Sequence, residues 1–224
     1  MTSVKLSKRL DRIAGLIPAG SVIFDVGSDH ALLPCYLVAE GIAEKAYAGD
    51  NKEGPLSRAV ESIERFGLQG RVIPVLSDGL QKAPEDADTV VIAGMGYHTA
   101  VKILEEADLK KYSRIIVQVN SDPDKIRSFL NNNKYSIIDE AVILDGSHFY
   151  EIIVFTPVFS RAYSDREIEY GPVLLKRKED SFREYLESRT EKLKRINASA
   201  HREDYQQKIS EIEDLYAELW RDKI

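Results

Sequence analysis

A short apolar run that ends in an acidic glycine turn is the feature that most restricts the fold. Val22-Ile23-Phe24 is typical of a buried strand, and Asp25-Val26-Gly27-Ser28-Asp29-His30-Ala31 follows it directly before an apolar helical segment. A strand, a tight turn and a helix in this order predict a doubly wound α/β sheet with a ligand at the carboxyl ends of its strands. Gly27 lets that ligand approach the backbone.

The residue types in this turn separate two classes of cofactor. A dinucleotide site prefers Gly-x-Gly-x-x-Gly, whereas here Asp29 stands where the second glycine belongs, and this disfavours NAD and FAD. S-adenosylmethionine has no phosphate and carries an ammonium and a sulfonium, so an acidic turn suits it. The alternative is that the acid and the glycine only form a turn and cap the next helix.

Three further apolar runs end in residues that suit the same site. Lys45–Asp50 ends in an acid where nucleotide-binding sheets hold a ribose diol, and Asp78, after Arg71–Leu76, suits the amino group of adenine. Thr89–Ala93 is followed by Gly94-Met95-Gly96, which would let a sulfonium or a target nucleophile come close. The candidate cofactor-binding residues are Asp25, Gly27, Ser28, His30, Asp50, Asn51, Asp78, Gly79, Ala93, Gly94 and Met95.

The rest of the first 157 residues continues the alternation of helices and strands. A fifth strand is predicted at Arg114–Val119, and the β runs Tyr135–Leu144 and Phe149–Phe155 flank a turn of the Asp-Gly type. A closing hairpin of this kind, with an antiparallel last strand, is typical of methyltransferase sheets. Helices are predicted at Ser7–Ile17, Ala31–Glu40, Pro55–Phe66, His98–Glu106 and Asp122–Asn132.

Composition excludes several other classes. The single Cys35 excludes an internal disulfide, and with four His and no Cys/His pair at metal spacing no metal is expected. No stretch approaches the roughly 18 apolar residues of a membrane span, and the N-terminus lacks the apolar core of a signal peptide. These features predict a cytoplasmic protein.

Residues 158–224 are densely charged and form a second predicted domain. Apolar residues at helical spacing predict two helices, the first over Pro172–Ile196, joined near Asn197–Ala200. Their narrow apolar stripes are typical of an antiparallel, coiled-coil-like hairpin. The first helix carries eight basic residues against five acids, so it predicts either an arm that grips nucleic acid or a packing and oligomerisation hairpin with salt-bridged faces.

Five motifs are spread along essentially the whole chain. They are Leu6-Ser7-Lys8-Arg9-Leu10, Asp25 to Pro34, Gly54-Pro55-Leu56, Ser77-Asp78-Gly79-Leu80 and Ile92-Ala93-Gly94-Met95-Gly96. Together they resemble the bacterial tRNA (adenine-N1)-methyltransferase family that acts on adenine 22 in the D-arm, and the Gly-Ser-Asp-His-Ala block is the most specific of them. The resemblance implies a class I, Rossmann-like, seven-stranded methyltransferase domain at residues 1–157 and a helical hairpin domain at 158–224.

The reaction that the resemblance implies assigns roles to three residues. Adenine N1 has a lone pair and no proton, so its methylation needs a flipped base and stabilisation of a growing positive charge rather than a general base. Asp29 is the predicted residue for that charge, with His30 able to orient it or to contact phosphate. Asn120 is predicted at the adenine edge. Tyr97 either stacks on the adenine or fills a pocket that the family leaves open for it.

Two positions differ from the family pattern, and they leave alternatives open. Gly94-Met95-Gly96-Tyr97 and Gln118-Val119-Asn120 stand where family members have Gly-Met-Gly-Gly and Gln-Pro-Asn. The chain is therefore a methyltransferase of adenine N1 in tRNA, a paralogue with another RNA or a small molecule as substrate, or a module that binds S-adenosylmethionine without turnover. A monomer or weak homodimer is expected. The candidate RNA contacts are Lys5, Lys8, Arg9, Lys176, Arg177 and Arg183.

Overall fold

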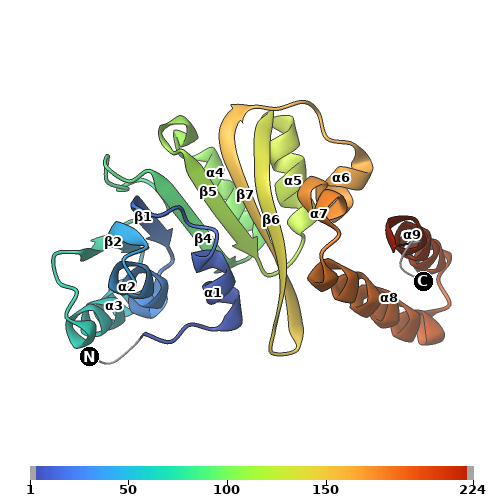
Figure 1. Ribbon diagram of the computed structural model, residues 1–224, viewed down its shortest axis with the longest axis horizontal. Helices are drawn as coiled ribbons and strands as arrows, with labels where there is room; N and C mark the ends of the chain where they lie inside the picture. The colour runs from blue at the N-terminus through green and yellow to red at the C-terminus, as the bar shows by residue number, and fades with distance from the viewer. Residues whose placement is uncertain (1–3, 221–224) are drawn as a thin grey trace.

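The computed structural model describes residues 4–220, except for the side chain of Ala200. It has one seven-stranded sheet in the order β3-β2-β1-β4-β5-β7-β6 (Figure 1). Only β7 runs antiparallel to its neighbours β5 and β6. The strands are β1 (Ser21–Val26), β2 (Ala43–Asp50), β3 (Val72–Leu76), β4 (Thr89–Met95), β5 (Arg114–Val119), β6 (Tyr135–Asp145) and β7 (His148–Phe159).

Helices cover both faces of this sheet. One face packs against α1 (Lys8–Ala14), α2 (Leu32–Ala39) and α3 (Glu53–Phe66), and the other against α4 (Tyr97–Glu105) and α5 (Pro123–Asn132). The strands divide their side chains between the two faces, since Ile23 joins one core cluster and Phe24 the other. This alternation follows from the two-residue period of a strand, and burial on both faces explains the continuous apolar runs.

The predicted strands and the antiparallel hairpin are confirmed, with boundaries that differ by a few residues. The helix predicted at Ser7–Ile17 is shorter, because Ser7 caps α1 and Gly15 ends it. The helix predicted from Ala31 is preceded by a short 3₁₀ turn, η1 (Asp29–Ala31). β7 continues to Phe159, so it passes the predicted domain boundary at residue 157.

The C-terminal region differs more from the prediction. The helix predicted over Pro172–Ile196 is two helices, α7 (Pro172–Arg177) and α8 (Asp180–Ala200), because Lys178 adopts a left-handed conformation with φ of 54°. Residues Asn197–Ala200, where the join was predicted, still belong to α8, and the turn to α9 (Glu203–Trp220) follows Ala200. A further helix, α6 (Asp165–Tyr170), was not predicted, although its capping box Ser164-x-x-Glu167 is a recognisable start signal.

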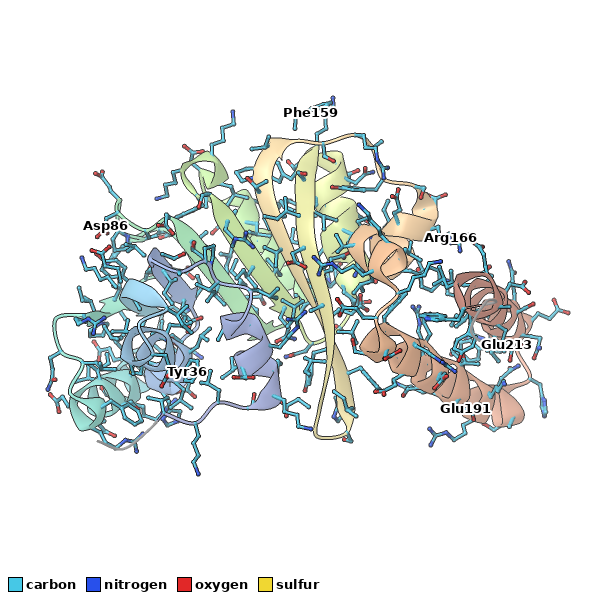
Figure 2. All side chains as sticks on the ribbon, in the orientation of Figure 1. Tyr36, Asp86, Phe159, Arg166, Glu191 and Glu213 are labelled. Atoms are coloured by element: carbon cyan, nitrogen blue, oxygen red, sulfur yellow. The ribbon has the colours of Figure 1, made fainter. Side chains whose placement is uncertain are left out.

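α8 and α9 run antiparallel and bury a third apolar cluster next to β6 (Figures 1 and 2). The Phe182 ring near the start of α8 lies 6.1 Å from the Trp220 ring at the end of α9. Near the other end, Lys194 forms an ion pair with Glu213 at 2.9 Å. The pairing thus has the predicted antiparallel direction.

A buried ion network joins the C-terminal helices to the sheet. Arg127 of α5 is fully buried, and its guanidinium donates to Glu140 of β6 at 2.7 Å and to Glu151 of β7 at 2.5 Å. Glu140 also accepts from the backbone amide of Val173 at 2.8 Å, and Glu151 from the hydroxyl of Tyr185 at 2.7 Å. One helix and two strands of the sheet region (α5, β6 and β7) therefore meet two C-terminal helices (α7 and α8) at one charged centre.

Among residues 4–220, no helix is long and apolar enough to cross a membrane.

Candidate active site

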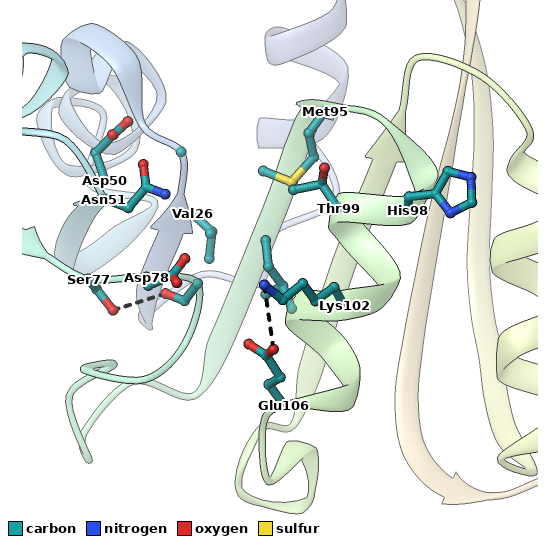
Figure 3. Close-up of a pocket in the computed structure, with 13 residues that line it drawn as sticks. Val26, Asp50, Asn51, Ser77, Asp78, Met95, His98, Thr99, Lys102 and Glu106 are labelled. Carbon is teal, nitrogen blue, oxygen red and sulfur yellow. Dashed lines mark hydrogen bonds and ion pairs between the residues drawn. The ribbon is translucent and has the colours of Figure 1, made fainter.

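The carboxyl ends of β1 to β4 and one face of α4 line a cavity of about 510 Å³ (Figure 3). Its size is within the range of small-molecule sites. Parallel strands end at one edge, so residues far apart in sequence meet there. The predicted residues that line the cavity are Gly27, Asp50, Asn51, Asp78, Gly79 and Met95.

The turn after β1 is held in an unusual backbone conformation. Gly27 has φ of 73°, and the amides of Gly27 and Ser28 both donate to the carbonyl of Gly49, at 2.8 and 2.9 Å. His30 and Ala31 also have positive φ, at 63° and 48°. Two such non-glycine residues in succession store strain, which is common at ligand sites.

Gly27 leaves space that a side chain would take. A Cβ atom on Gly27 would lie 3.3 Å from Cε of Met95, another residue that lines the cavity. The positive φ favours glycine here, and a Cβ atom would also crowd the end of the Met95 side chain.

Asp25 lies beneath the turn rather than in the cavity. It is buried, and the hydroxyl of Ser28 donates to its Oδ2 at 2.5 Å. Burial raises the pKa of Asp25 to about 7, while the Ser28 hydrogen bond and the charge of Arg9 act in the opposite direction. Asp25 therefore changes its charge near neutral pH.

Asp50, the last residue of β2, and Asp78, in the loop after β3, line the cavity (Figure 3). Oδ1 of Asp50 accepts from the amide of Lys52 at 3.0 Å, which fixes the carboxylate and leaves Oδ2 available. Next to Asp78, the hydroxyl of Ser77 donates to the Gly79 carbonyl at 3.1 Å and holds the loop closed. The two acids give this half of the cavity a negative charge.

Helix α4 forms a wall that the sequence analysis missed. His98, Thr99, Lys102, Ile103 and Glu106 line the cavity from this helix and its C-cap. Figure 3 shows the Lys102 side chain extending into the cavity, where it pairs with Glu106 at 3.8 Å. Residues 99, 102, 103 and 106 have the spacing of one helix face, which was the available signal.

Asp29 lies outside the cavity, beside the turn. Arg58 of α3 donates to its Oδ1 at 2.8 Å, and His30 Nε2 lies 3.8 Å away. The hydrogen bond from Arg58 is the main reason why the pKa of Asp29 is below its usual value. Asp29 is thus ionised at neutral pH, and its pairing with Arg58 was not predicted.

Tyr97 and Asn120 lie at the ends of β4 and β5. Asn120 Nδ2 donates to the carbonyl of Gly94 at 2.9 Å, which ties the two strand ends together. The Tyr97 ring lies 3.9 Å from the His98 ring, and the Lys125 ammonium lies 4.5 Å above it. The remaining candidates, Ser28, His30, Ala93 and Gly94, do not line the cavity.

The predicted basic residues do not form one free surface. Lys5, Lys8 and Lys176 are exposed, but Arg177 pairs with Asp139 at 2.6 Å and Arg183 with Glu187 at 3.3 Å. Arg9 departs most from its predicted role as an RNA contact. Its side chain is half-buried and donates to Gln118, because α1 packs against one face of the sheet near β6.

A family model described as tRNA (adenine(22)-N(1))-methyltransferase matches residues 23–219. The tRNA (adenine(22)-N(1))-methyltransferase of Bacillus subtilis is 34% identical over 96% of this chain and 95% of its own length. Both comparisons include the cavity and the C-terminal helices.

Solved structures agree with these matches. A Streptococcus pneumoniae protein in complex with S-adenosyl-L-methionine has a TM-score of 0.86 and 33% identity, and the match covers 95% of this chain and 100% of that one. TrmK of M. capricolum in complex with S-adenosyl-homocysteine has a TM-score of 0.80 and 32% identity, with 94% and 97% covered. The predicted Rossmann-like methyltransferase fold is confirmed.

Proposed function

The chain belongs to the tRNA (adenine(22)-N(1))-methyltransferase family, and from this premise we propose that it transfers a methyl group from S-adenosyl-L-methionine to N1 of adenine 22 in tRNA. The observation that carries the proposal is the acidic cavity at the carboxyl edge, where Asp50 and Asp78 follow successive strands beside a glycine turn. This chemistry suits a cationic adenosine derivative better than a nucleotide with phosphates.

The residues in and around the cavity fit the functional groups of this cofactor. Asp50 has a free carboxylate oxygen for a ribose diol, Asp78 suits an exocyclic amino group, and Gly27 leaves the space that a Cβ atom would fill. When bound, S-adenosyl-L-methionine supplies an electrophilic methyl carbon on a sulfonium. Asp25, Ser28 and His30 support the turn, and Ala93, Gly94 and Met95 at the end of β4 would let the sulfonium or the target base come close to the backbone.

Asp78→Ala is expected to weaken cofactor binding by about 10- to 100-fold, because hydrogen bonds to a charged group contribute about 1.5–3 kcal/mol. The measurement is titration calorimetry with S-adenosyl-homocysteine. At saturating cofactor the variant should regain most of its transfer rate. A lower rate with unchanged affinity would contradict the assignment of Asp78 to the cofactor.

Cofactor affinity is expected to rise with pH through the titration of Asp25. Its pKa of about 7 means that it is mostly protonated at pH 6 and mostly ionised at pH 7.5. Because a cationic cofactor prefers the ionised form, its Kd should fall roughly eightfold between these pH values if that form alone binds. Asp25→Asn should remove this dependence, and a pH-independent Kd for the unaltered protein would contradict it.

The target adenine would be held by residues at the ends of β4 and β5. N1 attacks with its own lone pair, so these residues need to orient the base and stabilise the charge that develops. Asn120 offers its amide oxygen to the adenine edge, and Tyr97 offers an aromatic ring. Asp29, kept ionised by Arg58, supplies the negative charge.

The tRNA would be bound by exposed lysines of both regions, with residues 1–157 as the methyltransferase domain and 158–224 as a helical domain. Lys5, Lys8 and Lys176 are available as phosphate contacts, whereas Arg177 and Arg183 would first have to leave their acidic partners. The protein would act in the cytoplasm as a monomer or weak homodimer.

The direct test uses two tRNA transcripts that differ only at position 22. With labelled S-adenosyl-L-methionine, the transcript with A22 should accept about one methyl group per molecule and the transcript with G22 essentially none. Equal labelling of both transcripts would show that the methylated position is elsewhere in the tRNA. Labelling of neither transcript would contradict the proposed function.

A further inference from the structure

Arg9 has an environment that the proposed reaction does not yet explain. Its half-buried guanidinium donates through Nη1 to Oε1 of Gln118, a fully buried side chain, and its Cζ lies 5.5 Å from the ring centroid of Tyr150. A guanidinium held between a buried amide and an aromatic ring has a fixed orientation. It differs in this respect from Lys8, the exposed lysine on the same helix.

The contacts of Arg9 join four elements at the carboxyl edge. Its backbone amide on α1 donates to Oδ2 of Asp145 at the β6–β7 turn, at 3.1 Å. The Gln118 oxygen at the end of β5 also accepts from the amide of Gly94 at the end of β4, at 3.0 Å. Gly94 has φ of 79°, and a Cβ atom there would lie 3.4 Å from Nη1 of Arg9.

Arg9 also supplies the charge that acts on Asp25. Ala48 of β2 and Val91 of β4 flank Asp25 in the sheet, and both are apolar. Ser28 donates a neutral hydrogen bond from the turn. Among the residues that the structure describes, Arg9 is the charged group whose field lowers the pKa of Asp25.

We propose that Arg9 is a positioning residue for methyl transfer, which fixes the Gly94 turn and the Gln118 amide beside the target base. The inference rests on the proposed function, because that function places the base at the ends of β4 and β5. It also links α1, which carries two of the candidate RNA contacts, to the centre of the site.

Two substitutions separate the geometry of Arg9 from its charge. Arg9→Met removes both the charge and the guanidinium geometry, whereas Arg9→Lys keeps the charge but loses the planar guanidinium. Arg12→Gln on the same helix is the matched control. For each protein we would measure thermal stability, kcat, KM for tRNA, and the pH midpoint of cofactor affinity by calorimetry.

Arg9→Met should lower kcat about 10- to 100-fold with KM for tRNA within about threefold, because a displaced strand end misplaces the base. Its pH midpoint should rise by about half a unit or more, since the charge that favours ionised Asp25 is gone. Arg9→Lys should keep the midpoint but still lower kcat. Arg12→Gln should resemble the unaltered protein.

A raised KM with unchanged kcat, and a salt dependence weakened by about one phosphate contact, would show Arg9 to be an RNA contact and overturn the proposal. An unchanged midpoint in a folded Arg9→Met protein would also overturn it. The midpoint needs no turnover, so it tests Arg9 even if no tRNA is methylated. A complete absence of tRNA methylation would count against the proposed function instead.

Discussion

Asp29→Ala should lower the rate of methyl transfer about 10²- to 10³-fold while the Kd for cofactor stays within about threefold of its original value. The loss is of the size found when one preorganised electrostatic group is removed from an active site. Asp29 lies outside the cofactor cavity and is ionised beside Arg58. Its carboxylate can therefore act on the charge that develops on adenine without holding the cofactor.

Single-turnover rates at saturating tRNA, together with calorimetry, would separate the two effects. Asp86→Ala is the matched control, because Asp86 is an equally exposed aspartate that pairs with Lys45 at 3.0 Å, on a loop outside the cavity. The control should keep both rate and affinity. Parallel losses of rate and affinity in Asp29→Ala would make Asp29 a cofactor residue and exclude the assigned role.

Arg127→Met should lower the free energy of unfolding by about 3–5 kcal/mol at pH 7, because it leaves two buried carboxylates without their counterion. Glu140 and Glu151 are almost fully buried, and each accepts a hydrogen bond from Arg127. Burial already raises the pKa of Glu140. The loss should therefore shrink as pH falls toward 5, where the stranded carboxylates can take up protons.

Urea unfolding at pH 7 and pH 5 measures this difference. Arg166→Met is the control, since Arg166 pairs with Glu218 at 2.8 Å on the surface, and an exposed pair contributes about 0–1 kcal/mol. If Arg127→Met cost no more than the control, the network would not hold the C-terminal helices to the sheet.

Most of the sheet could be predicted because its strands are buried on both faces. Apolar runs such as Thr89–Ala93 and Arg114–Val119 correspond to strands within one or two residues. The break between α7 and α8 could not be predicted, because the apolar stripe continues across it. Lys178 takes a left-handed conformation that its residue type does not favour.

The candidate site was predictable where an acidic residue stands at or just after the end of a strand, as at Asp50 and Asp78. It was not predictable where side chains meet through tertiary packing. Arg58 reaches Asp29 from α3, and Arg9 turns inward to Gln118, although its neighbour Lys8 stays exposed. Helical periodicity places a residue on a face but does not tell which element that face will meet.

The most direct test of the central claim is the identity of the modified nucleoside. Unmodified tRNA incubated with the protein and S-adenosyl-L-methionine would be digested and its nucleosides identified by mass spectrometry and chromatography against standards. The account predicts N1-methyladenosine. N6-methyladenosine, another methylated nucleoside, or no modified nucleoside despite measurable cofactor binding would contradict it.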